Sequence, residues 1–369
     1  MSQPPITLHR RSTRRISLGG VPIGGGAPIS VQSMTKTDTR NVRATVAEIR
    51  RLERAGCEIV RLAVPDREAA EAIREIRKRV RLPLVADIHF DHRLALACLE
   101  LGIDGLRLNP GNIGSREKVR AVVAAAKGRA IPIRIGVNSG SLEKDIERKH
   151  GGATAAAMVE SALRHIRILE ELDFRLIKVS LKASDVLRTL EAYRLLAQSV
   201  DYPFHAGITE AGTLLPGAVK SAVGLALLIQ EGLADTVRVS LTAPPEEEVR
   251  VAYQVLGSLG LRRRGPNIVS CPTCGRCEVD LRRIAAEVEK RLSGLPESPT
   301  VAVMGCMVNG PGEAKEADIG VACGRGAGVI FKGGKLVGRV PEGKISEALL
   351  KEVNKLAGRK EQMRRKAGK

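Results

Sequence analysis

The chain has 369 residues, of which 43% are hydrophobic and 2% aromatic, and its formal net charge is +19. This length suggests two or three domains and allows a core large enough that no metal is needed merely to fold. No apolar run approaches the length that crosses a bilayer, and the basic N-terminus lacks the apolar segment of a signal peptide. We therefore expect a cytoplasmic protein with no membrane partner.

The positive charge is concentrated at the two ends of the chain. Residues 359–369 hold six basic residues and one acid, and residues 10–15 hold four arginines. About half of the excess charge thus lies in segments that we expect to be frayed. With three tyrosines, four phenylalanines and no tryptophan, few rings can stack on bases, so nucleic acid is not the expected partner. The remaining positive field suits an anionic substrate or an acidic protein.

From residue 28 to 260, short runs of β-branched residues alternate with longer segments of helical periodicity, which is typical of a parallel βα fold. Helices are predicted over Val42–Ala55, Arg67–Val80, Arg93–Leu101, Ala155–Leu172, Asp185–Ser199, Val219–Glu231 and Glu246–Leu259. Eight strands are predicted over Pro28–Met34, Glu58–Val64, Pro83–His89, Asp104–Asn109, Pro132–Asn138, Leu176–Leu181, Pro203–Thr209 and Asp235–Leu241. Eight strands within about 230 residues fit a closed α/β (β/α)8 TIM barrel better than an open doubly wound sheet.

After residue 262 the pattern changes to that of a small α+β domain. Its predicted strands are Thr300–Met304, Asp318–Ala322, Gly328–Lys332 and Lys335–Arg339, and its predicted helices are Val279–Leu292 and Ser346–Leu356. We therefore predict a substrate-binding barrel domain over residues 1–262, a metal-cluster domain over 263–356 and a disordered basic tail over 357–369.

The ends of the predicted barrel strands carry an unusual number of cations. In βα barrels the active site forms at the carboxyl ends of the strands, and five of the eight ends here hold Arg61, Arg107, Arg134, Lys182 and Arg238. A single arginine would more often pair with a neighbouring carboxylate, but Asp87 and Glu210 are the only counter-charges predicted at this level. The set predicts a site for phosphate, and more readily for two phosphates than for one. Glu210 can accept or deliver a proton there if the site is desolvated.

Three cysteines and a glutamate in the second domain form a candidate metal site. Cys271 and Cys274 are spaced so that a turn directs both thiols to one centre, and Cys306 lies before a Gly-Pro-Gly segment that predicts a tight turn bringing Glu313 back toward it. A structural zinc site would need a fourth Cys or His, for which Cys277 and Cys323 are the candidates. Spacing alone leaves iron–sulfur and zinc equally open. The remaining cysteines, Cys57 and Cys98, are expected to be small buried hydrophobes.

With these residues in view, the chain resembles the bacterial two-domain form of the GcpE/IspG family of 4-hydroxy-3-methylbut-2-enyl diphosphate synthases, from about Thr13 to Leu356. The resemblance rests on motifs in both predicted domains, namely PISVQSMT (28–35), AGCEIVR (55–61), LRLNPGNI (106–113), RIGVN (134–138), GITEAG (207–212), DTVRVS (235–240), CPTC (271–274) and GCMVNGPGE (305–313).

The resemblance implies a reductive ring opening and dehydration of 2-C-methyl-D-erythritol 2,4-cyclodiphosphate in the methylerythritol phosphate route of isoprenoid biosynthesis. It implies a [4Fe-4S] cluster that delivers two electrons and is held by Cys271, Cys274, Cys306 and Glu313, with Glu313 as the exchangeable ligand. It assigns the diphosphate to Arg61, His89, Arg107, Arg134, Lys182, Arg238 and Ser240. It places Asn138, Thr209 and Glu210 at the reacting carbon skeleton, with Glu210 as the proton donor.

The partners implied by the resemblance are a flavodoxin or ferredoxin as electron donor and a second copy of the chain in a head-to-tail homodimer. Two other readings are weighed against it. One is a zinc-dependent barrel enzyme acting on a phosphosugar, which metal analysis would separate. The other is a basic RNA-binding protein with a structural metal knuckle, which would show a steep salt dependence of RNA affinity.

Overall fold

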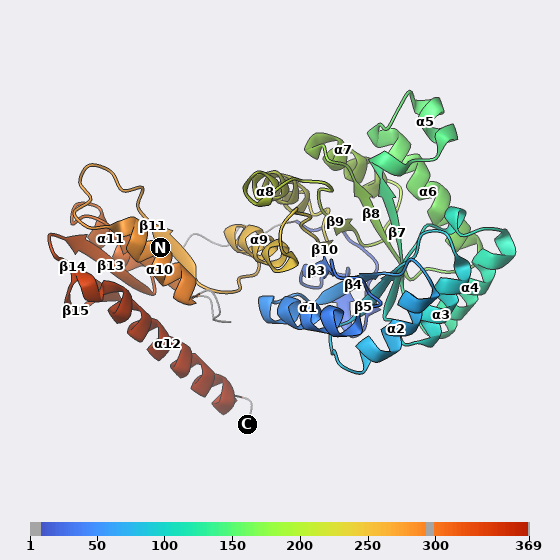
Figure 1. Cartoon of the computed structure of the whole chain (residues 1–369). Coiled ribbons are helices and arrows are strands. Elements are labelled where there is room, and N and C mark those ends of the chain that lie inside the picture. The colour runs from blue at the N-terminus through green and yellow to red at the C-terminus, as the bar shows by residue number, and fades with distance from the viewer. Residues whose placement is uncertain (1–8, 293–298, 368–369) are drawn as a thin grey trace. The chain divides into compact units, whose positions relative to one another are not determined.

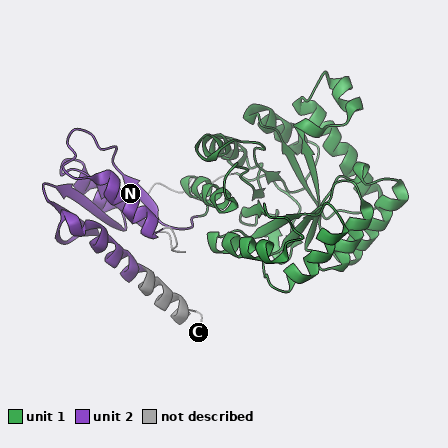
Figure 2. Ribbon diagram, in the orientation of Figure 1, with its two compact units in different colours: residues 1–262 green, residues 263–369 purple. Residues whose placement is uncertain are grey.

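The computed structural model describes residues 9–292 and 299–367, with side chains through residue 356. The chain divides into two compact units, Met1–Arg262 and Arg263–Lys369 (Figure 2). Among the described residues, no helix combines the length and the apolar character needed to cross a membrane.

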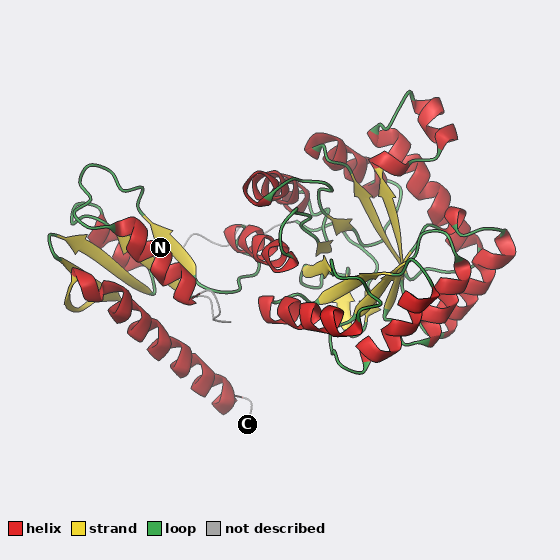
Figure 3. Cartoon of the chain, viewed as in Figure 1, coloured by secondary structure: helices red, strands yellow, loops and turns green. Residues whose placement is uncertain are grey.

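The first unit is a parallel barrel, as predicted (Figure 3). Its sheet has the strand order β8-β7-β6-β5-β4-β3-β10-β9, and a bridge between Val179 and Phe204 joins the two ends of this series. All eight predicted strands are found among the described residues. Seven are shorter than predicted, and β8 has the predicted length but begins one residue later. They are β3 (Ser30–Met34), β4 (Ile59–Ala63), β5 (Leu84–Asp87), β6 (Gly105–Arg107), β7 (Ile133–Asn138), β8 (Ile177–Lys182), β9 (His205–Ala206) and β10 (Thr236–Val237).

Helices connect successive barrel strands and surround the sheet (Figure 1). Side-chain caps at several N-termini, such as Asp66, Thr154 and Asp185, accept backbone N–H groups that the helix leaves unpaired. Buried apolar residues at three- and four-residue spacing then face the sheet. The helices are α1 (Val42–Ala55), α2 (Arg67–Arg77), α3 (His92–Glu100), α4 (Arg116–Gly128), α5 (Lys144–His150), α6 (Ala155–Glu171), α7 (Val186–Ala197), α8 (Leu214–Gln230) and α9 (Pro245–Ser258), with short 3-10 turns at Pro110–Asn112 and Ser139–Ser141.

An antiparallel hairpin, β1 (Ile16–Leu18) with β2 (Val21–Ile23), packs at the amino ends of the barrel strands. Its apolar side chains form a small core with Ile59 and Val85. The arginines before it are not frayed, contrary to expectation. Arg10 pairs with Asp235, Arg11 donates to backbone carbonyls at Val200 and Tyr202, and Arg14 pairs with Asp201. Part of the N-terminal charge is therefore used to fasten the segment to the barrel.

The second unit is built on a mixed sheet in the order β11-β12-β13-β14-β15. Val301 and Val303 contribute to a core shared with helices α10 and α12, while the alternating Ala302 and Met304 pack on the other side. Strands β11, β12 and β13 run parallel, and β14 and β15 complete the sheet as an antiparallel pair. The elements are β11 (Asn267–Ser270), α10 (Leu281–Leu292), β12 (Thr300–Met304), α11 (Gly310–Glu316), β13 (Ile319–Gly324), β14 (Ala327–Lys332), β15 (Lys335–Pro341), a 3-10 turn at Glu342–Lys344 and α12 (Ile345–Ala367).

Two features of this unit differ from the sequence-based expectation. The Gly-Pro-Gly segment begins helix α11 instead of forming a tight turn, because proline is well tolerated in the first turn of a helix. The basic segment 357–369 was expected to be disordered, whereas the backbone of α12 is helical to Ala367. Its alanine, arginine, lysine, glutamate and methionine residues have high helix propensity. The side chains of this segment lie outside the described residues.

Candidate active site and thiol site

Six cations project into the first unit from neighbouring strands. Arg107, Arg134, Lys178 and Lys182 are each at most 7% exposed. The side chains of Arg61 and Arg238 are 12% and 14% exposed. Fixed charges are seldom buried unless they are paired. Facing carboxylates or a bound anion must therefore balance these charges.

Asp87, the last residue of β5, is a carboxylate that pairs with two of these cations, Arg61 and Arg107. Its Oδ1 accepts a hydrogen bond from Nη1 of Arg107 at 3.2 Å, and its Oδ2 lies 3.6 Å from Nε of Arg61. Burial disfavours the charged carboxylate, but Arg61, a hydrogen bond from His89, and Arg107 outweigh burial and hold the pKa of Asp87 well below its usual range. Asp87 is therefore an ionised counter-charge and not a proton donor.

Arg107 is held in place by the neighbouring strand. Its Nη2 donates to the carbonyl oxygen of Gly136 at 3.0 Å, and Asn109 both donates to that carbonyl and accepts from the Gly136 N–H. A Cβ at position 136 would stand 2.8 Å from Nε of Arg107, so the glycine provides the space in which the guanidinium lies. The arginine is thereby positioned before any ligand arrives.

A second buried carboxylate, Glu248 of α9, was not predicted. It accepts from the Ser33 hydroxyl at 3.2 Å and from the Leu241 N–H at 3.0 Å. It also lies 3.0 Å from Nζ of Lys36 and 4.0 Å from Nη2 of Arg238. The sequence places three glutamates together at the start of this helix, so nothing in the pattern distinguished the one that turns inward.

Within the described part of the barrel, the buried cations outnumber the buried carboxylates. The pKa values of several of these cations are lowered in consequence. Burial, followed by the charge of Arg238, lowers the pKa of Arg61 to about 9. Burial and then Arg61 lower the pKa of Arg134 well below its usual value. Burial and then Arg134 do the same for Lys182. A dianionic ligand would supply the missing counter-charge and raise these pKa values again.

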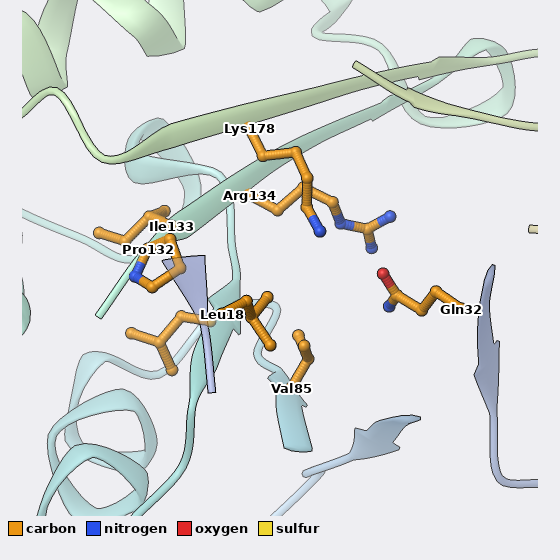
Figure 4. A pocket seen from close by; sticks show the side chains of 8 residues that line it. Leu18, Gln32, Val85, Pro132, Ile133, Arg134 and Lys178 are labelled. Carbon is orange, nitrogen blue, oxygen red and sulfur yellow. The ribbon is translucent and has the colours of Figure 1, made fainter. Parts of the chain in front are cut away.

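Lys178 lies deeper in the barrel than the predicted site. Figure 4 shows its side chain and that of Arg134 projecting toward Gln32. Among the described residues, neither the Lys178 ammonium nor the Gln32 amide has a hydrogen-bond partner. Burial and then Arg134 lower the pKa of Lys178 to about 7. A signal was present in the sequence, because Lys178 and Lys182 are four residues apart in one strand and so share its inward face.

The other predicted residues stand around this cation cluster. His89 is more than half exposed, with its ring nitrogens 3.1 Å from Nη1 of Arg107. Asn138, Thr209 and Ser240 are half-buried at strand ends or just beyond them. Glu210 is exposed, in a left-handed conformation with φ 52°, and the described residues give it no hydrogen bond or ion pair with the cations.

In the second unit, the carboxyl ends of the parallel strands bring three thiols to one edge of the sheet. Cys271 follows β11, Cys306 lies two residues beyond β12, and Cys323 is near the end of β13. The Gly305 N–H donates to Sγ of Cys271 at 3.4 Å. Burial raises the pKa of Cys323 to about 12, so this thiol stays protonated at neutral pH.

Hydrogen bonds favour the thiolate form at two of the predicted ligands. Backbone N–H groups of Asn309, Val308 and Gly310 lower the pKa of Cys306, and N–H groups of Arg276 lower that of Cys274. The thiolate is the form of cysteine that binds metal. Glu313 lies in the first turn of α11 and is exposed. No group of three or more His, Cys, Asp and Glu within the described ranges is arranged to hold a metal ion.

Comparison with protein families gives two matches that follow one another along the chain. Residues 13–253 match the GcpE TIM-barrel domain, and residues 267–355 match the GcpE protein C-terminal domain. The chain belongs to the GcpE family. The resemblance noted from the sequence is thus confirmed over both parts of the chain.

Relatives within the GcpE family are similar over nearly their whole length. The chain is 60% identical to the 4-hydroxy-3-methylbut-2-en-1-yl diphosphate synthase (flavodoxin) of Geobacter sulfurreducens, covering 95% of this chain and 99% of the relative. It is 58% identical to the protein of the same name from Thermodesulfovibrio yellowstonii, covering 94% and 100%. Among solved structures, dihydropteroate synthase from Stenotrophomonas maltophilia matches with a TM-score of 0.50 and 14% identity, over 67% of this chain and 97% of that one. A match at this low identity shows the barrel fold alone.

Proposed function

We propose that this chain converts 2-C-methyl-D-erythritol 2,4-cyclodiphosphate to 4-hydroxy-3-methylbut-2-enyl diphosphate by reductive ring opening and dehydration, in the methylerythritol phosphate pathway of isoprenoid biosynthesis. The observation that carries the proposal is the cluster of buried, under-neutralised cations in the barrel of a GcpE-family chain. Such a cluster suits a substrate with two phosphates, and the relatives are named as synthases of a diphosphate.

The cations have a binding role and an electrostatic role in this proposal. Arg61, Arg107 and Arg134 hold the phosphates together with His89, Lys182, Arg238 and Ser240. Because the guanidiniums are already in place, they stabilise charge that develops on the leaving phosphate oxygen with little reorganisation. Arg107 is the best prepared of them, being fixed between Asp87 and Gly136.

Asn138, Thr209 and Glu210 are proposed to act on the carbon skeleton. All three follow or end strands at the carboxyl side of the barrel, which is where the chemistry of this fold takes place. Glu210 is proposed as the proton donor for the departing hydroxyl. Because Glu210 is exposed, bound substrate must exclude water from this carboxyl before it can take this role.

A [4Fe-4S] cluster is proposed at the thiol site, where Cys271, Cys274, Cys306 and Glu313 would hold it. The thiolate-favouring contacts at Cys274 and Cys306 fit this donor set. When bound, the cluster supplies the two electrons. Such thiolates suit the reducing cytoplasm.

The proposed electron donor is a flavodoxin or ferredoxin. The names of the relatives include flavodoxin. A chain with a net charge of +19 attracts an acidic partner over a distance of about one Debye length.

We further propose a head-to-tail homodimer in which the cluster unit of one copy serves the barrel of the other. In support, α8 presents a row of exposed apolar side chains at four-residue spacing, Leu215, Val219 and Val223. Such a row is costly to leave in water and suits a second copy of the chain. Glutamate at positions 219 and 223 should shift the chain from dimer to monomer in light scattering, and an unchanged mass would contradict this interface.

The function is tested by iron and sulfide analysis of anaerobically purified protein, with its visible spectrum and turnover of the cyclodiphosphate. About four irons per chain and activity with a low-potential donor are expected. A colourless zinc protein with full activity would overturn the proposal. RNA binding with a steep salt dependence and no turnover would support the nucleic-acid reading instead.

Substrate binding is tested separately from the cluster. Arg134→Met in metal-free protein should weaken binding of the cyclodiphosphate by roughly 10- to 150-fold, because a charge-assisted hydrogen bond contributes about 1.5–3 kcal/mol. Lys127→Met, on an exposed helix end, is the matched control. Equal affinities of the two variants, measured by calorimetry, would place the diphosphate elsewhere.

A further inference from the structure

Two of the seven cysteines belong neither to the barrel core nor to the proposed cluster site. Cys57 and Cys98 are buried in the barrel core, and Cys271, Cys274 and Cys306 are proposed cluster ligands. Cys277 and Cys323 remain. Both belong to the second unit, but Cys277 is half-buried in the loop that also carries Cys271, whereas Cys323 is fully buried in a strand.

Gly305 brings Cys277 close to Cys271. A Cβ at position 305 would lie 2.5 Å from Sγ of Cys277 and 3.4 Å from Sγ of Cys271. The two sulfurs are therefore within about 6 Å of each other, a separation that rotation of the two side chains can reduce. The absent side chain of Gly305 is what lets both thiols occupy this place.

Gly305 contacts both ends of the loop, through the sulfur of Cys271 at one end and the backbone of Glu278 at the other. The Gly305 N–H donates to Sγ of Cys271, and the Gly305 carbonyl accepts from the Glu278 N–H at 3.1 Å. Between these two anchors, residues 271–277 contain no helix or strand. The loop can adjust while its ends stay together, which is the arrangement that disulfide geometry requires.

Cys274, the other thiol of this loop, is oriented differently. It is exposed, and its sulfur interacts with Arg276. A disulfide between Cys271 and Cys274 is what sequence spacing alone would suggest, but Cys277 is the thiol that shares the Gly305 contact with Cys271.

We propose that Cys271 and Cys277 form a reversible disulfide when the chain is without its cluster and meets a peroxide. The Cys271 thiol releases its proton, and the resulting thiolate attacks one peroxide oxygen and breaks the O–O bond, giving a sulfenic acid. The leaving hydroxide takes up the released proton and forms one water. The Cys277 thiol then attacks the sulfenic sulfur, forming the S–S bond and releasing a second water. Two thiols are oxidised, hydrogen peroxide is reduced to two waters, and no other reactant is needed.

The disulfide would control loading of the metal site. The disulfide occupies Cys271, which is a cluster ligand in the proposed function on which this step rests. The cluster therefore cannot assemble until a thiol reductant reopens the bond. It also protects Cys271 from oxidation to the irreversible sulfinic and sulfonic acids. The site thus has a recoverable inactive form instead of a damaged one.

The bond is detected by peptide mapping of the full-length chain. Metal-free reduced protein is treated with one equivalent of hydrogen peroxide, alkylated with N-ethylmaleimide and digested with trypsin. Cleavage after Arg276 separates Cys277 from Cys271 and Cys274. A Cys271–Cys277 bond therefore joins two peptides, with the alkyl group on Cys274, whereas a Cys271–Cys274 bond stays within one peptide.

The wild type and Cys323→Ser, the matched control, should both give the joined peptides. Cys277→Ser should lose them and, after dithiothreitol treatment, should recover less iron than the wild type. A bond within one peptide in the wild type, or no bond at all, overturns the proposal. Anaerobic iron and sulfide analysis of untreated wild type reports on the cluster separately, so the two proposals can fail independently.

Discussion

Arg107 donates to the carboxylate of Asp87 over 3.2 Å inside the barrel, and both side chains are 8% exposed. The same carboxylate is close to Arg61, so one anion is shared between two buried guanidiniums. Because one carboxylate serves two guanidiniums, positive charge remains that a diphosphate can neutralise. The arrangement therefore bears on substrate binding as well as on stability.

Asp87→Asn should destabilise the barrel by about 3 kcal/mol at neutral pH, because removing one partner leaves buried cations uncompensated. The folded pKa of Asp87 lies below its unfolded value of about 3.9, so its contribution is present above pH 4 and is lost as the pH falls through the folded value. The difference between wild type and variant should therefore shrink as the pH is lowered from 5 toward 2.

Urea unfolding followed by tyrosine fluorescence measures this difference, because Tyr193, Tyr202 and Tyr253 all lie in the barrel unit and the chain has no tryptophan. Asp145→Asn, which breaks an exposed pair with Arg164, is the control and should leave stability unchanged. A difference that is constant across pH would show that Asp87 is not the ionised counter-charge.

Much of the barrel could be predicted because each buried strand is a short β-branched run, and the cations are visible as exceptions within those runs. Glu248 could not be predicted, because its role depends on how α9 packs against the strand that carries Ser33. Helix α11 was missed since Gly-Pro-Gly is typical of turns, and only the three-dimensional context shows the proline starting a helix. Strand β11 was missed because it is four residues long and directly precedes the Cys-Pro-Thr-Cys segment.

Lys178→Met should stabilise the barrel by about 1–4 kcal/mol at pH 7, since a buried amine without a partner among the described residues is replaced by an apolar chain of similar length. The folded pKa of Lys178 is lowered to about 7, whereas the unfolded value is about 10.4. Between these values the unfolded chain binds more protons, so wild-type stability from this group rises with pH.

The stabilising effect of Lys178→Met should accordingly be largest below pH 7 and should fade toward pH 10.5. Parallel urea titrations at pH 6, 8 and 10 test the trend. An advantage that grows with pH, or a variant less stable than wild type at pH 6, would mean that the ammonium is well solvated or paired in the folded protein.

Glu313→Ala should leave the fold of the second unit intact and make the proposed cluster labile, with turnover reduced at least about tenfold, since changes even to the partners of metal ligands cost 10- to 100-fold. The side chain is exposed and contributes to none of the apolar cores of this unit. Iron content, visible absorption and turnover after anaerobic purification measure the effect. Cys277→Ala and Cys323→Ala should keep both cluster and turnover, and the reverse ranking would indicate a site of four cysteines.

Gly305→Ala should destabilise the second unit by about 1–3 kcal/mol, because the added methyl group would stand 2.5 Å from Sγ of Cys277. The backbone itself tolerates alanine, since Gly305 is not among the residues with positive φ. Hydrogen exchange at β12 and β13 measures the loss of stability.

The double variant Gly305→Ala, Cys277→Ala removes the sulfur as well and should restore most of the protection from exchange. The other contacts of the new methyl group, with Leu281 and Cys271, are at 3.3 and 3.4 Å. If the double variant is as unstable as Gly305→Ala alone, the space at Gly305 is required by the backbone and not by Cys277.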